Sequence, residues 1–255
     1  MRSVWIIAKK ELKIFLYTPI AYILTAFFLL VSGFFFYNIL AWVNEQTMRL
    51  MQSGYPLDRI NVNQLLFEPF FNNMAVVLMF LLPLLSMRLF ADEKKMRTEE
   101  MLLTAPVPLA AIIIGKYLAV LAIYAGILLL TATFAVFAFV HGNPELAPLL
   151  AAYLGLFLMG AVFIAIGTFA SALTENQVIA AAISISAILL IWVISWIGES
   201  GPGAWKGVLA YLSFLTHFRN TIGGVIDTQD IVYFLSFIAL SLYLTRAVFE
   251  FRKWR

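Results

Sequence analysis

The sequence of 255 residues contains no cysteine, only two histidines and few charged side chains. Without cysteine the chain cannot form a disulfide, bind a metal through thiolates or use a cysteine nucleophile. Charged residues make up 12% of the chain, whereas soluble domains carry about 25%. Hydrophobic residues make up 63%, which is more than a soluble core of this size can bury, so we expect the chain to lie in a lipid bilayer.

Motifs for nucleotide binding and hydrolysis are also missing from the sequence. There is no G-x-x-x-x-G-K-[ST] phosphate loop, and the glycine-rich residues 201–207 have the wrong spacing for one. His141 and His217 belong to no H-E-x-x-H zinc motif, and no serine lies in a G-x-S-x-G turn. We therefore predict no catalytic and no metal site, and we interpret both histidines as loop or interface side chains.

Six apolar segments are long enough, or nearly so, to cross a bilayer as helices of roughly 20 residues. They comprise residues 20–41, 70–87, 118–140, 146–171, 178–197 and 231–249. The first exceeds the apolar core of a signal peptide, so we expect it to be retained. Apart from Arg246 the segments contain no Asp, Glu, Lys, Arg or His, which argues against a proton- or sodium-driven carrier.

The basic residues predict the orientation of the chain. Thirteen of the 17 Lys and Arg residues lie at the N-terminus, after the second segment or at the C-terminus: Arg2, Lys9, Lys10, Lys13, Arg88, Lys94, Lys95, Arg97, Lys116, Arg246, Arg252, Lys253 and Arg255. Because cytoplasmic loops carry the excess of Lys and Arg, we expect both termini in the cytoplasm. That arrangement requires an even number of spans, and six satisfies it.

Residues 1–18 are predicted to form a separate amphipathic helix along the membrane surface. Lys9, Lys10 and Lys13 lie on one side of this helix and hydrophobic residues on the other, and Pro19 then turns the chain into the first span. Glu11 breaks the pattern because it projects within the apolar arc. Two interpretations stay open: its side chain reaches water from the helix edge, or it contacts a partner subunit.

The longest charged stretch is residues 88–109, after the second span. Thr98 can cap a short helix, with acidic residues at its positive N-terminal end and apolar residues behind them. The residues concerned are Arg97, Thr98, Glu99, Glu100, Met101, Leu102 and Leu103. So short a helix is unstable alone. It is either part of a loop folded back on its own helix ends or, as we favour, a docking element for a partner protein.

The segment 198–230, on the predicted outer side, is partly apolar and contains His217. It is predicted to form a re-entrant or interfacial hairpin before the sixth span. Asp227 would cap that span and Asp230 would lie in its first turn, both in structural roles. The fourth span is rich in small residues, which pack either within the subunit or at a subunit interface.

Three stretches resemble the permease subunits of ABC-2 transporters. They are Lys9-Lys-Glu-Leu-Lys13 with Pro19-Ile-Ala-Tyr22, residues 86–95 continuing through 98–107 to Gly115-Lys116, and His217-Phe218 with Gly224-Val-Ile-Asp227, Asp230 and Tyr233. The likeness covers nearly the whole chain and is greatest to the gliding-motility-type permease, which is related to permeases of nitrous oxide reductase maturation. The sequence departs from this pattern at residues 99–101, where relatives tend to read Leu-Glu-Leu.

The resemblance implies an all-α membrane protein of six helices, with an N-terminal elbow helix, a coupling helix after the second span and an outer re-entrant hairpin. It also implies a bacterial inner-membrane location, lipid contacts, no nucleic acid, a cytoplasmic ATPase dimer that binds ATP and Mg, and a second permease subunit of the same or another kind. The expected function is to couple ATP hydrolysis to export or mechanical work. The alternative is a scaffold that anchors a motility or secretion complex without moving a solute. An intramembrane enzyme would need a polar cluster within the spans, and the sequence of the spans shows none.

Overall fold

A computed structural model describes residues 2–52, 63–99, 107–141, 144–200 and 213–253 of the chain. These residues form helices and connecting turns and contain no strand. Six helices are long and apolar enough to cross a membrane: Pro19–Gln52, Asn63–Lys95, Leu109–His141, Leu146–Leu173, Gln177–Ser195 and Thr228–Phe251. The predicted all-α fold with six candidate spans is therefore confirmed.

The helices extend beyond the apolar segments that predicted them. Their bounds are α1 Arg2–Tyr17, α2 Pro19–Gln52, α3 Glu68–Ser86, α4 Arg88–Lys95, α6 Leu109–His141, α7 Leu146–Leu173, α8 Gln177–Ser200, α10 Phe214–Ile222 and α11 Thr228–Lys253, with a π-helical turn, Asn63–Phe67, before α3. Hydropathy locates the apolar part of a helix, but the backbone stays helical through polar residues until a breaker intervenes. Ionisable residues that the sequence suggested were in loops, such as Arg88 and Lys116, therefore lie within helices.

Helix α7 is the centre of the bundle, where it packs against α3, α4, α6, α8, α10 and α11. Six of its small residues are buried: Gly155, Gly160, Ala161, Ala165, Gly167 and Ser171. A methyl group at Gly160 would overlap the ring of Tyr124, and one at Gly167 would overlap the hydroxyl of Ser86. The small residues thus allow close packing within the subunit, which decides between the two alternatives that the sequence left open.

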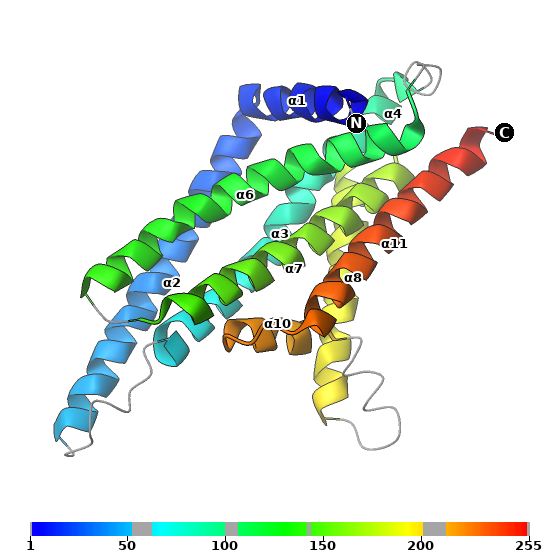
Figure 1. Cartoon of the computed structure of the whole chain (residues 1–255). Helices are drawn as coiled ribbons and strands as arrows, with labels where there is room; N and C mark the ends of the chain where they lie inside the picture. Colours follow the sequence, from blue (N-terminus) through cyan, green and yellow to red (C-terminus); the bar gives the residue numbers. More distant parts are fainter. Residues whose placement is uncertain (1, 53–62, 100–106, 142–143, 201–212, 254–255) are drawn as a thin grey trace.

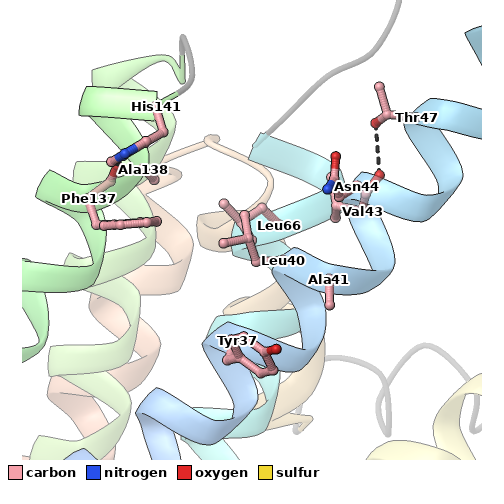
Figure 2. A pocket seen from close by; sticks show the side chains of 10 residues that line it. All are labelled: Tyr37, Leu40, Ala41, Val43, Asn44, Thr47, Leu66, Phe137, Ala138 and His141. Carbon is pink, nitrogen blue, oxygen red and sulfur yellow. Dashed lines mark hydrogen bonds between the residues drawn. The ribbon is translucent and has the colours of Figure 1, made fainter.

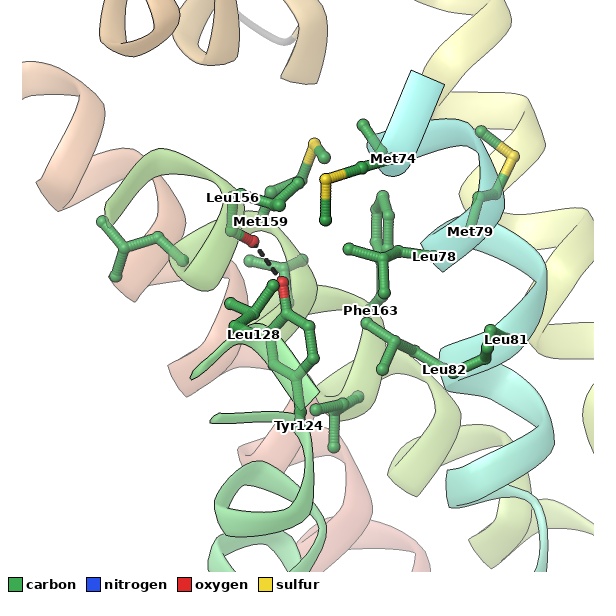
Figure 3. Packing of buried hydrophobic residues seen from close by; sticks show 14 of the residues in the cluster. Met74, Leu78, Met79, Leu81, Leu82, Tyr124, Leu128, Leu156, Met159 and Phe163 are labelled. Carbon is green, nitrogen blue, oxygen red and sulfur yellow. Dashed lines mark hydrogen bonds between the residues drawn. The ribbon is translucent and has the colours of Figure 1, made fainter. Parts of the chain in front are cut away.

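The apolar core lies between α3, α6 and α7, as Figure 3 shows. Met74, Leu78 and Phe163 are fully buried there. The hydroxyl of Tyr124 donates a hydrogen bond of 2.6 Å to the carbonyl oxygen of Leu156. Since a buried hydroxyl without a partner is costly, this bond fixes the position of the ring between α6 and α7.

Helix α1 lies across one end of the bundle, and α10 lies near the other (Figure 1). The first end also carries α4, the start of α6 and the C-terminus, so three basic stretches that are far apart in the sequence meet there. We call it the basic end. Helix α2 begins with Pro19 at its first position, where the missing amide hydrogen costs nothing.

Candidate functional site

The ammonium group of Lys116 joins three helices at the basic end. Lys116 is 2% exposed. Its Nζ lies 3.1 Å from Oε1 of Glu11 on α1 and 2.8 Å from Oε1 of Glu93 on α4. It also donates to the carbonyl oxygen of Leu89 at 2.8 Å. An ammonium group has three donors, so all three are used and the burial of the charge is compensated.

This cluster gives Glu11 a partner that neither interpretation of the sequence included. The residue is 7% exposed and pairs with Lys116 inside the same chain, so it is not a side chain that reaches water from the helix edge, whereas contact with a partner subunit stays a prediction. Its position within the apolar arc is explained because that arc packs on α6 rather than lying wholly in lipid. The sequence flagged the acid as unusual, but its cation lies 105 positions away.

Helix α4 is bonded to the end of α7 by polar groups. The hydroxyl of Ser171 accepts hydrogen bonds from the backbone amides of Phe90 at 2.9 Å and Ala91 at 3.0 Å. The buried side chain of Lys94 donates to the carbonyl oxygen of Ala172, one of the last in α7. Helix C-termini attract cations through their unpaired carbonyl groups, so this contact is electrostatically favourable. Together these bonds hold α4 against the central helix.

A cleft of about 610 Å³ separates α1 from α4 at this end. Its lining combines three basic with three acidic side chains and several apolar and hydroxyl residues: Lys10, Arg88, Lys116, Glu11, Asp92, Glu93, Ile14, Phe15, Leu89, Met96, Thr18 and Thr98. The guanidinium of Arg88 lies 4.0 Å from the ring centroid of Phe15. Because the charges balance and apolar groups lie between them, the cleft suits a protein segment better than a simple anion.

Helix α4 ends in a tight turn at the start of the predicted docking residues. The backbone amide of Arg97 donates to the carbonyl oxygen of Lys94 at 3.0 Å, and the backbone amide of Thr98 donates to the carbonyl oxygen of Glu93 at 2.9 Å. Arg97 has a φ of 56°, the left-handed conformation that glycine usually supplies in this Schellman turn. An exposed arginine thus occupies a position that favours glycine.

The other predicted residues of this end divide into two groups. Lys9, Lys10 and Lys13 are exposed on α1, as the amphipathic pattern requires. Thr98 and Glu99 follow the turn after α4, and the Thr98 hydroxyl donates to the carbonyl oxygen of Glu93 at 3.2 Å. Glu100, Met101, Leu102 and Leu103 lie outside the described residues, so the helix predicted for them stays a prediction.

A second polar cluster lies at the opposite end, between α10 and α11. Nδ1 of His217 is 2.5 Å from Oδ1 of Asp230, and both side chains are buried. The imidazole also stacks on Tyr233 at 4.0 Å between ring centroids. Of the two interpretations of His217, a loop or an interface side chain, the loop is wrong, because α10 carries the imidazole into the bundle. Asp227 accepts from the amide of Gln229 at 3.1 Å, which makes it the N-cap of α11.

A pocket of about 510 Å³ lies between α2, the end of α6 and the π-helical turn (Figure 2). Tyr37, Asn44, Thr47 and His141 supply its polar groups, and Leu40, Leu66 and Phe137 are among its apolar residues. His141, also interpreted as a loop residue, is the last residue of α6, where its Nδ1 lies 3.0 Å from the carbonyl oxygen of Phe137. Among the described residues that line this pocket, none is Asp, Glu, Lys or Arg.

Within the described ranges, no three His, Asp or Glu side chains are close enough to hold a metal ion. An all-helical bundle with six apolar helices, and with its polar clusters at the two ends of the bundle, is a multi-pass membrane protein. Residues 5–254 match the family described as ABC-2 family transporter protein, and the chain belongs to that family. It is accordingly a membrane component of an ABC transporter.

The family match confirms the resemblance at the level of ABC-2 permeases. Members of this family are membrane subunits that normally work with a separate ABC ATPase. The finer likeness to gliding-motility permeases stays a prediction. No curated protein matches the chain.

Proposed function

We propose that this chain is the permease subunit of an ABC transporter of the bacterial inner membrane and that a separate ATPase drives it from the basic end. The observation that carries the proposal is the buried Lys116, which ties Glu11 of α1 and Glu93 of α4 to α6. Both termini and the segment after α4 are cytoplasmic in this proposal. ATP and Mg bind to the partner ATPase dimer, since the chain has no phosphate loop.

The contacts of α4 support a route for the motion. A force on residues 97–103 reaches α4 through the turn at Arg97, and the Lys116 cluster carries α1 and the start of α6 with it. The bonds from Ser171 and Lys94 pass the same force to the end of α7. Closely packed helices change between discrete arrangements rather than bending continuously, so the movement shifts whole helices.

The substrate moves between two permease subunits, of the same or a different kind. Inside one subunit, the buried residues of the central helix α7 are mostly apolar or small. The polar clusters occupy the ends of the helices instead. An apolar, closely packed interior supports a path between subunits rather than through one of them.

Substitution of Arg97 by glycine tests the docking site without disturbing the fold. Glycine suits the left-handed backbone of residue 97, so stability stays equal or rises by up to about 1 kcal/mol. If the guanidinium contacts the ATPase, R97G lowers co-purification of the ATPase and ATP turnover in the reconstituted complex. Lys95→Ala, which removes another exposed cation at the end of α4, is the matched control and changes both less.

Two further variants address the residues beyond Arg97. Leu102→Asp puts a charge into the predicted apolar contact, and Glu100→Lys reverses the charge at the predicted helix start. We expect both to impair assembly and ATP turnover. If both variants and R97G leave assembly and turnover unchanged, the coupling site is wrong. If the intact complex turns over no ATP at all, the scaffold interpretation is correct instead.

A further inference from the structure

Helix α1 has three distinct sides. The first is buried against the bundle and carries Ala8, Glu11 and Phe15. The second carries Lys10 and Ile14, which line the cleft toward α4. The third side faces away from that cleft, and neither the fold nor the proposed ATPase site accounts for it.

The third side carries a basic strip formed by Arg2, Lys9 and Lys13. The spacings of seven and four residues place these side chains in one row along the helix. All three are exposed. In the described part of the chain none of them has an acidic partner, whereas Lys10 lies 4.0 Å from Glu11. The strip is thus a row of uncompensated positive charge.

An apolar flank runs beside the basic strip. Trp5 is 71% exposed and Leu16 is 47% exposed. Trp5 precedes Lys9 by four residues and Leu16 follows Lys13 by three, so each apolar side chain neighbours a cation on the helix surface. A large exposed tryptophan is unfavourable in water, but it is common at the boundary between acyl chains and headgroups.

The connection to α2 places α1 at this boundary. Helix α1 ends at Tyr17 and α2, a candidate membrane span, begins at Pro19. Less than one helical turn therefore separates the end of α1 from the start of the span. Figure 1 shows α1 lying across the ends of the other helices. A helix at the start of a membrane span, with an apolar flank beside a row of cations, is typical of an interfacial helix that contacts lipid phosphates.

We propose that Arg2, Lys9 and Lys13 form a binding surface for the headgroups of anionic phospholipids in the leaflet at the basic end. Trp5 and Leu16 enter the acyl boundary, and the three cations meet the phosphate groups above them. Lipid binding then holds α1 in the membrane plane while the Lys116 cluster holds it to α4 and α6. This proposal requires no ATPase, so it stands or fails separately from the proposed function.

Native mass spectrometry of the purified full chain tests the proposal. The protein in neutral detergent is mixed with phosphatidylglycerol or with phosphatidylcholine, and the lipids that it retains are compared. We expect the wild type to prefer phosphatidylglycerol. Because each cation at an anionic surface contributes about a fivefold gain in affinity, R2Q/K9Q/K13Q should lose most of that preference. Added salt should weaken the preference of the wild type, since these charges are exposed.

The matched control removes three exposed cations from other helices: Arg49→Gln, Arg219→Gln and Arg246→Gln. It should keep the preference for phosphatidylglycerol. The proposal is overturned if R2Q/K9Q/K13Q keeps the preference, or if the control loses it equally. If R2Q/K9Q/K13Q keeps the preference and also no longer co-purifies with the ATPase, the strip is a protein contact instead.

Discussion

Replacing Lys116 by methionine tests whether the buried cluster holds α1 to the bundle. Methionine fills a similar volume but leaves the carboxylates of Glu11 and Glu93 without their ammonium group. Removing one partner of a buried ion pair costs about 3–5 kcal/mol. We expect the lower end, about 3 kcal/mol, because water still reaches part of the Glu93 side chain and Lys10 lies 4.0 Å from Glu11.

Thiol labelling measures this loss directly, because the natural chain has no cysteine. A cysteine at Ala8, on the buried side of α1, reacts with a maleimide only when α1 opens from the bundle. If the cluster contributes about 3 kcal/mol to closure, labelling of Ala8→Cys in the K116M background should be about a hundredfold faster. A cysteine at Ala152, buried on α7, reports on global unfolding and should stay slow in both backgrounds.

The triple variant Glu11→Gln, Glu93→Gln and Lys116→Met supplies the complementary result. It removes both carboxylates together with their cation, so labelling of Ala8→Cys should return toward the rate of the parent. Unchanged labelling in K116M alone would refute the cluster as the contact that holds α1. Equal acceleration at Ala8→Cys and Ala152→Cys would indicate loss of the whole fold instead.

Other perturbations probe the packing and the opposite end of the bundle by thermal unfolding in detergent. Gly160→Val should destabilise the chain by about 3 kcal/mol through overlap with its neighbouring ring, whereas Gly126→Ala, where a methyl group meets no atom within 4 Å, should be neutral or stabilising. Asp230→Ala should lower the free energy of unfolding by about 3 kcal/mol in the wild-type chain. In a chain that already carries His217→Ala the same substitution should lower it much less, because the interaction between the two side chains is already lost.

Hydropathy predicted the six spans because a membrane helix needs some 20 consecutive residues of high mean hydropathy, and this mean can be read from the sequence alone. The cap at Asp227 was predictable for a similar reason, since donor and acceptor are two residues apart. Both features depend on neighbours in sequence. They could be found without knowing which helices meet.

The partners of Glu11 and His217 could not be predicted in the same way. Each of these buried polar groups depends on a residue of another helix, and helical spacing identifies a face without identifying what covers it. The small residues of α7 show the same limit, since their spacing indicated close packing but not that Tyr124 and Ser86 fill the space. An acid within an apolar arc was the available signal for a buried cation elsewhere.

The two polar clusters and the packing of α7 together suggest how one end of the molecule influences the other. Ser171, near the C-terminus of α7, is bonded to α4, and Gly155, in the N-terminal half of α7, packs closely against Thr221 of α10. Between these points α7 is surrounded by apolar side chains that leave little room for bending. A displacement of α4 should therefore move α7 as a rigid rod and reach α10, which His217 fixes to α11 through Asp230. The two polar clusters would set which helices move together, and the close packing of α7 would set how far the motion travels.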